Sequence, residues 1–178
     1  MSICLRRREF IAGLGGAVTA WPLAARLMAE HSCYLVPTLV TYDQIAQFGK
    51  TNKFPEASLR KLEDVLHAGA GAIETALRAG VKVGFGTDLL GETHPAQSKE
   101  FALRAQVQDN ADILHSATII NADLLQHSGR LGILKAGAFA DFLLVNGDPL
   151  QDLAVLSGQG ERLDVIVRGR VIFKNTLH

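Results

Sequence analysis

Blocks of apolar and polar residues predict a strand, a long helix and a second strand in the middle of the chain. Residues 33–40 form an apolar run of strand length. Such a run is typical of a strand buried on both faces of a parallel sheet, although Pro37 must leave one ladder bond unmade. A helical pattern opens at Pro55 and ends at Gly80, a residue suited to the position after a helix. Its apolar positions are Leu59, Leu62, Leu66, Ile73 and Leu77. Residues 81–85 form the next short strand, so the three elements predict one βαβ unit.

The pattern changes towards the C-terminus. A helical stretch over about residues 98–108 precedes two shorter helices. Further along, glycines separate short apolar segments, of which residues 139–145 form the clearest strand. Two more apolar segments flank the tripeptide 168–170, Arg-Gly-Arg, and predict a hairpin. The chain therefore predicts an α/β part over residues 30–128 and a strand-rich part over residues 129–178.

The first 29 residues have the order of an export leader. Three arginines at residues 6–8 precede a short apolar stretch over residues 11–20, as in signal peptides. That stretch is about half the roughly 20 apolar residues that span a membrane, so we expect no permanent anchor. The arginine pair followed by Glu-Phe-Ile resembles the twin-arginine export signal of bacteria, and we expect processing between Ala20 and Ala29. The alternative is a basic amphipathic helix that is never cleaved. A working leader implies an exported or periplasmic protein, and otherwise the protein is cytoplasmic.

Composition excludes several classes of protein. The chain has 178 residues, of which 48% are hydrophobic and 20% charged, so it is expected to fold around a core. Its 18 basic and 18 acidic side chains leave no excess positive charge for nucleic-acid binding. Two cysteines, Cys4 and Cys33, are too few for a disulfide framework. A complete eightfold α/β barrel typically needs about 250 residues, so the chain is too short for one.

Asp88 is the strongest candidate for chemistry. It follows the predicted strand at residues 81–85, and ligands and catalytic groups collect at this end of the strands in parallel sheets and barrels. A carboxylate in this position can hold a divalent metal, or accept a proton from water and return it to a leaving group. The alternative is an aspartate that caps a helix or forms a turn.

His94 lies in the same polar loop, six residues after Asp88. It could bind a substrate carboxylate or orient Asp88, and the alternative is a solvated loop histidine. The remaining histidines lack the H-x-H, H-E-x-x-H or C-x-x-C spacing of metal sites. They are His31, His67, His115, His127 and His178. No nucleophilic serine elbow, phosphate-binding loop or dinucleotide motif follows a predicted strand, so the sequence does not support those chemistries.

Eight short segments match one known family in order and spacing. They are residues 34–39, 84–89, 100–104, 117–118, 121–122, 129–132, 137–145 and 147–152. On these residues, the chain from about Leu27 onward resembles the metal-dependent amidohydrolase superfamily. The likeness is greatest to its imidazolonepropionase-like and prolidase-like branch.

The resemblance implies a fold and a metal site. In that family an eight-stranded barrel binds one or two divalent metals, commonly zinc, through histidines, often a carboxylated lysine, and an aspartate on the eighth strand. Asp88 matches this aspartate, which serves as metal ligand and proton shuttle, and residues 34–39 match the seventh strand. The segment from Gly129 onward resembles a small β-sandwich, in which Asp141 would be structural. The expected fold class is therefore α/β, with the last two βα units of a TIM-type barrel and part of a β-sandwich.

The chain also departs from the family. It contains no H-x-H pair, and no residue matches the first six barrel strands or their ligands. A catalytic zinc takes three or more protein ligands, and Asp88 supplies one. We therefore expect a leader joined to the C-terminal portion of a hydrolase, whether a gene remnant, a misjoined reading frame or half of a split enzyme. This chain alone is expected to bind no metal tightly and to be inactive.

Two classes of function remain open at this point. As part of an enzyme, the chain would act on carbon–nitrogen bonds of small amide or dipeptide-like substrates by metal-activated water. Its partner would then be the missing N-terminal half of the barrel. As a non-enzyme, it would be an exported fragment or an interaction module. Because barrel strands without neighbours expose their edges, self-association is expected in either case.

Overall fold

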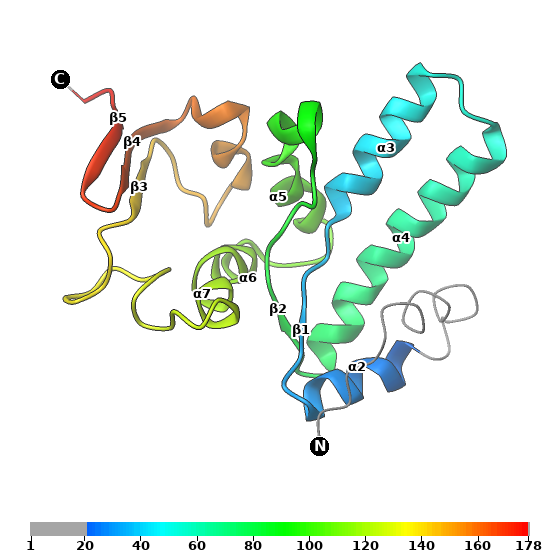
Figure 1. Cartoon of the computed structure of the whole chain (residues 1–178), viewed down its shortest axis with the longest axis horizontal. Coiled ribbons are helices and arrows are strands. Elements are labelled where there is room, and N and C mark those ends of the chain that lie inside the picture. The colour runs from blue at the N-terminus through cyan, green and yellow to red at the C-terminus, as the bar shows by residue number, and fades with distance from the viewer. Residues whose placement is uncertain (1–20, 178) are drawn as a thin grey trace.

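The computed structural model describes residues 21–177, so residues 1–20 of the predicted leader lie outside the described part. Helices α3 (Leu39–Thr51) and α4 (Glu56–Arg78) pack against each other at one end of the molecule, and a sheet of three strands lies at the other end (Figure 1). Helix α4 confirms the long helix predicted from the apolar spacing. Gly80 follows it with a φ of +79°, the left-handed conformation expected of a glycine after a helix.

Two short parallel strands lie in the middle of the molecule. β1 (Tyr34–Leu35) pairs with β2 (Lys82–Val83), and the α3–α4 pair connects them, which confirms the predicted βαβ order. The strand predicted over residues 33–40 is wrong in its second half, because α3 begins at Leu39. Pro37 has no N–H to continue the ladder, so the pairing ends before it. The apolar residues beyond it are buried as the first turn of a helix instead.

Helix α2 (Trp21–Glu30) packs against α4 and belongs to the main core. The Trp21 indole donates a hydrogen bond of 3.1 Å to the Ala72 carbonyl. The fully buried cluster consists of Ala25, Leu39, Ile73, Ala76, Val81 and Val83. Residues 21–29, which the sequence analysis places in the leader, therefore form a packed helix in this structure.

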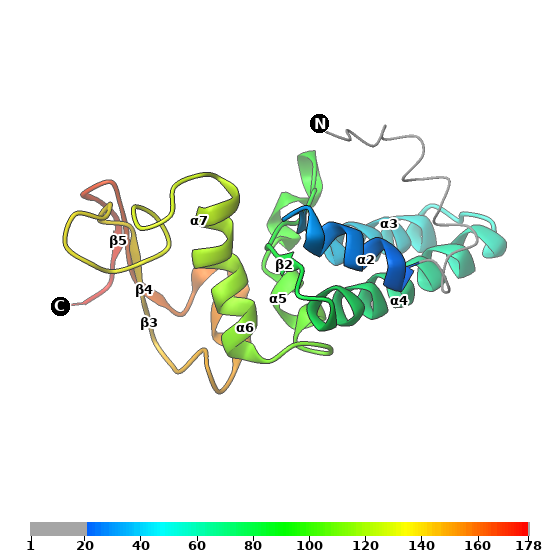
Figure 2. The same cartoon turned by 90° about the horizontal axis from the view of Figure 1, so that it is seen from below.

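The chain after β2 is mostly helical. A 3₁₀ helix (Gly91–Ala96) leads into α5 (Lys99–Arg104), which is shorter than the helix predicted there. Helix α6 (Asn110–His115), a π-helical turn (Ser116–Ile120) and α7 (Asn121–Leu124) then follow without a break. Figure 2 shows α6 and α7 as one run between the central strands and the three-stranded sheet.

The C-terminal part is an antiparallel sheet in the order β3–β4–β5. Its strands are β3 (Phe142–Val145), β4 (Leu163–Arg168) and β5 (Val171–Asn175). The predicted hairpin is confirmed: Gly169 and Arg170 join β4 to β5 with φ values of +57° and +72°. Two consecutive positive φ angles match the right-handed twist of the flanking strands.

The fold class is α/β, as predicted, and it is open. Within residues 21–177 the parallel sheet has two strands and does not close into a barrel. A 3₁₀ helix (Leu153–Leu156) between β3 and β4 contacts α5 and joins the sheet to the rest of the molecule. None of the described helices is both long enough and apolar enough to cross a membrane.

Many apolar side chains of the three-stranded sheet face solvent. Those of the two edge strands are between 41% and 65% exposed, namely Phe142, Leu143, Leu144, Val171, Ile172 and Phe173. Exposed apolar surface of this kind is a feature of sites that another protein surface covers.

Candidate functional site

Asp88 lies where the sequence places it, beyond the carboxyl end of β2. Residues Gly84–Thr87 follow the strand without regular secondary structure, and the next residue has a left-handed conformation with a φ of +50°. This conformation costs a residue other than glycine of order 1 kcal/mol, and aspartate is one of the residues that tolerate it best. The Asp88 side chain is exposed, whereas the following Leu89 is buried. The turn is therefore anchored on its apolar side and presents its carboxylate to solvent.

His94 lies on the 3₁₀ helix of the same loop and is also exposed. The Thr93 hydroxyl fixes the start of this helix, because it donates to the Leu90 carbonyl at 2.7 Å and accepts from the Leu90 amide at 3.1 Å. The structure thus places both predicted site residues on one loop at the carboxyl edge of the parallel strands.

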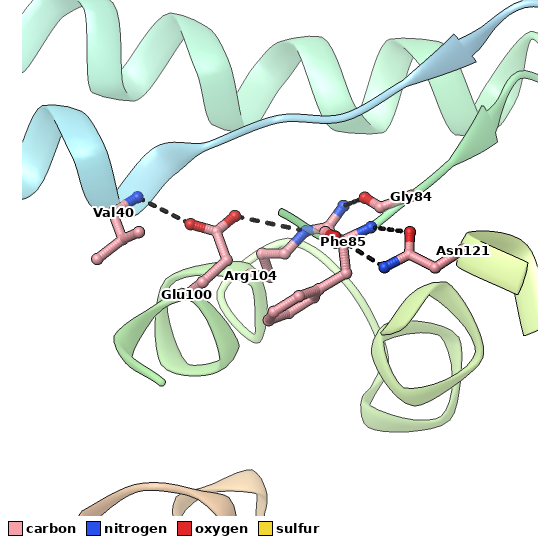
Figure 3. A network of polar contacts seen from close by, with 6 residues as sticks. All are labelled: Val40, Gly84, Phe85, Glu100, Arg104 and Asn121. Carbon is pink, nitrogen blue, oxygen red and sulfur yellow. Dashed lines mark hydrogen bonds and ion pairs between the residues drawn. The ribbon is translucent and has the colours of Figure 1, made fainter. Parts of the chain in front are cut away.

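A buried charged pair lies directly behind this loop. Glu100 and Arg104 are one turn apart on α5, both have no exposed surface, and Glu100 Oε1 lies 3.9 Å from Arg104 Nε. Glu100 Oε2 accepts a hydrogen bond of 2.8 Å from the amide of Val40, in the first turn of α3. Arg104 Nη2 donates one of 3.1 Å to the carbonyl of Gly84, just after β2. Figure 3 shows the pair spanning the ends of the two strands.

Burial acts against both charges of this pair. It raises the pKa of Glu100 to about 7, against the lowering effects of the Val40 amide and of Arg104. It lowers the pKa of Arg104 to about 10, so the guanidinium keeps its proton at neutral pH. Arg104 also lies over the ring of Phe85, with 5.4 Å from Cζ to the ring centroid.

Asn121 binds the segment before Asp88 from the opposite side. Its Oδ1 accepts from the Phe85 amide at 2.9 Å, and its Nδ2 donates to the Phe85 carbonyl at 2.8 Å. A side-chain amide thus makes the two hydrogen bonds that a neighbouring strand would make (Figure 3). Asn121 is the first residue of α7 and directly follows the π-helical turn.

A second polar cluster fixes the amino ends of the same strands. Asp123 Oδ2 accepts hydrogen bonds of 2.5 Å from both Lys82 and Tyr34, and Asp123 Oδ1 accepts one of 2.8 Å from Ser128. Lys82, and then Tyr34 and Ser128, hold the pKa of the Asp123 carboxyl well below its usual range. All polar groups of this cluster are partnered with one another, so its role is to hold β1, β2 and α7 together.

A cavity of about 520 Å³ lies between the end of β2 and the three-stranded sheet. Its lining includes Phe85, Phe101, Leu143 and Ile166 and contains no ionisable residue. Neither Asp88 nor His94 lines it, so it does not form part of the candidate site.

The described residues do not by themselves fit a catalytic metal. Within residues 21–177 no group of three or more His, Cys, Asp or Glu side chains lies close enough to hold one. A protein site for zinc needs at least three such ligands, and Asp88 offers one carboxylate.

Comparison with known proteins decides the family. The amidohydrolase family matches residues 18–172, which is most of the sequence. The chain belongs to the amidohydrolase family. This confirms the resemblance drawn from the short motifs. Comparison with curated proteins gives no match for this amidohydrolase chain.

Solved structures give the same result. A crystal structure of an amidohydrolase is 46% identical, with a TM-score of 0.81 over 88% of this chain and 38% of the other. A prolidase complexed with N-methylphosphonate-L-proline is 41% identical, with a TM-score of 0.79 over 86% and 38%. A Xaa-Pro dipeptidase with bound methionine in its active site is 30% identical, with a TM-score of 0.74 over 86% and 37%. This amidohydrolase chain therefore spans well under half the length of each of these relatives.

Sequence reasoning predicted Asp88 and His94 as site residues and assigned no role to Glu100, Arg104 and Asn121, which lie around the same segment. The last three residues lie in segments that match the family, but nothing in the sequence states which backbone groups they bind. One signal was available. Glu100 and Arg104 stand one helical turn apart in a stretch with the apolar residues of a buried helix face, where charged residues are found only in pairs.

The raised pKa of Glu100 predicts how the stability of the amidohydrolase chain depends on pH. The folded state binds the Glu100 proton more tightly than the unfolded state does. The contribution of this bound proton to stability is therefore complete below pH 4.5, the ordinary pKa of a glutamate, and is lost as the pH rises to about 7. In that interval this group alone should lower the free energy of unfolding by about 3 kcal/mol. Glu100→Gln retains an acceptor for the Val40 amide and should remove this decline.

Urea denaturation between pH 4 and pH 8 measures the effect. Glu56→Gln, at an exposed position of α4, is the matched control and should retain the pH dependence of the unsubstituted chain. Parallel curves for the unsubstituted chain and Glu100→Gln would show that the carboxyl does not titrate as described.

Proposed function

We propose that this amidohydrolase chain forms the C-terminal part of a metal-dependent enzyme that hydrolyses carbon–nitrogen bonds in small amide or dipeptide-like substrates. Relatives 41% and 30% identical that are named as a prolidase and a Xaa-Pro dipeptidase support this substrate class. The observation that carries the proposal is the position of Asp88, one short segment beyond the second of two parallel strands. In this proposal β1 and β2 are the seventh and eighth strands of a barrel, and Asp141 belongs to the sandwich part.

Asp88 has two roles in the proposed enzyme. It contributes one carboxylate to the metal site, and it accepts a proton from the attacking water and passes it to the leaving nitrogen. Its exposed side chain supports both roles, because neither needs a buried group to be uncovered first. His94, on the same loop, binds the carboxylate of the substrate through its imidazole.

In this proposal the remaining ligands and the metal chemistry come from another part of the enzyme, because no group of three or more His, Cys, Asp or Glu side chains within residues 21–177 could hold a metal. With one carboxylate, the chain has far less affinity for zinc than a site with three or four protein ligands. We therefore expect the isolated chain to hydrolyse no amide at a measurable rate. Supply of the first six strands, in cis or in trans from a close relative, should restore metal binding and hydrolysis together.

Replacement of Asp88 tests this assignment. In a protein completed with the N-terminal barrel part of the related prolidase, Asp88→Asn should lower kcat for a prolyl dipeptide by about 100-fold to 10,000-fold, the range for a lost general base. Asp64→Asn, on the exposed surface of α4, is the matched control and should leave the rate unchanged. Hydrolysis by the pure 178-residue chain, or equal rates for Asp88→Asn and the control, would contradict the proposal.

The second candidate role is self-association, which the exposed apolar side chains of β3 and β5 favour. Both are edge strands, and their backbone groups can pair with another chain. We expect the isolated chain to form oligomers at micromolar concentration, as measured by light scattering. Ile172→Lys on β5, at a side chain 62% exposed, should lower the average mass, whereas Leu90→Lys, 78% exposed on the Asp88 loop, should not. A monodisperse monomer of the unsubstituted chain would contradict this expectation.

The leader forms the last part of the proposal. Residues 1–20 direct export, and cleavage falls no later than the bond before Trp21, because α2 packs through Trp21 and Ala25 against α4. Within the interval expected from the sequence, Ala20 to Ala29, this leaves the bond between Ala20 and Trp21. Intact-mass measurement of periplasmic material from an expressing bacterium should therefore give a protein that retains all of α2.

A double substitution provides the control for export. Changing Arg7 and Arg8 to lysine should stop the export of the chain, whereas Arg26→Lys on α2 should not. A mature protein that begins later than Trp21 would contradict the cleavage assignment. Equal amounts of both variants in the periplasm would contradict the role of the arginine pair.

A further inference from the structure

We propose that Thr41, Arg104 and Asn121 are positioning residues, which together bind the backbone of three of the four residues before Asp88 and so set the place of its carboxylate. That this carboxylate takes part in catalysis rests on the proposed function. That the three side chains hold the segment before it rests on the structure alone.

The first observation is where the strand ladder ends. The last backbone bond between the two strands runs from the Gly84 amide to the Leu35 carbonyl, at 2.8 Å. Beyond this bond β1 turns away through Pro37 into α3. Within residues 21–177, the segment from Gly84 to Asp88 therefore continues without a strand beside it.

The second observation is what replaces the strand. Four backbone groups of this segment are bound by side chains. Arg104 donates to the Gly84 carbonyl at 3.1 Å, Asn121 makes both bonds to Phe85, and the Thr41 hydroxyl donates to the Thr87 carbonyl at 2.5 Å. The three side chains come from three different helices, α5, α7 and α3. The last of the four bonds is made at the residue that directly precedes Asp88.

The third observation is that Glu100 connects the helices that carry Thr41 and Arg104. Glu100 binds the Val40 amide, next to Thr41, and lies beside Arg104 on α5. Figure 3 shows this arrangement, in which the Glu100 carboxylate lies between the Val40 amide, at the start of α3, and the guanidinium of Arg104. These contacts join the start of α3, α5 and the residue after β2 to one another. A side chain that positions another must be rigid in this way.

A general structural role does not account for the pattern. In the Asp123 cluster at the other end of the strands, the side chains bind one another. Here they bind the backbone, and all four bonds fall within the four residues before a non-glycine residue with a φ of +50°. That conformation costs a residue other than glycine of order 1 kcal/mol, and the four bonds hold the backbone that leads into it.

Nuclear magnetic resonance of the full chain tests the inference without any activity. The three-bond HN–Hα coupling and the ¹³Cβ shift of Asp88 report the sign of its φ angle. Thr41→Val removes the bond to Thr87 and keeps the shape of the side chain. We expect the ratio of positive-φ to other conformers at Asp88 to fall about fivefold, as for one lost hydrogen bond. Thr41→Ser keeps the hydroxyl and should restore the signals of the unsubstituted chain.

Two further variants complete the design. Thr51→Val, also on α3, removes a hydroxyl bonded to the Gln47 carbonyl at 3.2 Å and should leave the Asp88 signals unchanged. Asn121→Ala should move them in the same direction as Thr41→Val. If Asn121→Ala does not fold, the Thr41 series decides the question alone.

Unchanged Asp88 signals in folded Thr41→Val would overturn the inference. Equal changes in Thr41→Val and Thr51→Val would overturn it as well, because they would indicate a general loosening of α3. An inactive completed enzyme in which Asp88 nevertheless responds to Thr41→Val would contradict the proposed function and support the positioning role. The two proposals therefore fail on different measurements.

Discussion

The buried pair of Glu100 and Arg104 is the interaction on which the arrangement of the central strands depends. Each member reaches from α5 to a different strand end, Glu100 to the first turn of α3 after β1 and Arg104 to Gly84 after β2. Both are fully buried, so removal of one would leave the other charge without water and without its partner. Removing one member of a buried ion pair costs about 3–5 kcal/mol where both groups are charged, a state that Glu100 reaches above its raised pKa of about 7. The pair therefore constrains where the two strands end relative to each other.

This constraint matters because the strands are so short. β1 and β2 have two residues each, too few for their ladder bonds alone to fix a register. Side chains do this instead, with Asp123 holding Tyr34 and Lys82 at the amino ends and Asn121 binding the backbone of Phe85 beyond the carboxyl ends. The result is a loop that begins at a fixed point and carries Asp88 and His94 at its surface. In the proposed enzyme, that surface faces the remainder of the barrel.

The sequence predicted correctly those elements that depend on interactions between residues close together in the chain. The apolar spacing of α4, the glycine after it and the Arg-Gly-Arg hairpin are all properties of a few neighbouring residues. The strand over residues 33–40 was predicted too long, because an apolar run suits a strand and a buried helical turn equally, and the choice was made by Pro37 and the burial of Leu39. Helix α3 was missed for the same reason.

The residues of the candidate site likewise differ in whether the sequence could predict them. Asp88 could be predicted, because a carboxylate after a strand stands in a recognisable place in the sequence. The roles of Arg104 and Asn121 could not, since each binds backbone groups 20 and 36 residues away in the chain. The burial of Arg104 and its bond to the Gly84 carbonyl are evident only in the folded structure.

The central claim is that side chains of this chain, rather than a neighbouring strand, hold the segment before Asp88. Hydrogen exchange of the Phe85 amide in the isolated, unsubstituted chain tests it most directly, because the acceptor of that amide is the Asn121 side chain. The account predicts exchange slower by about a hundredfold or more than in an unstructured peptide of the same sequence. Exchange at the rate of the unstructured peptide, in a chain whose α4 amides are protected, would contradict it.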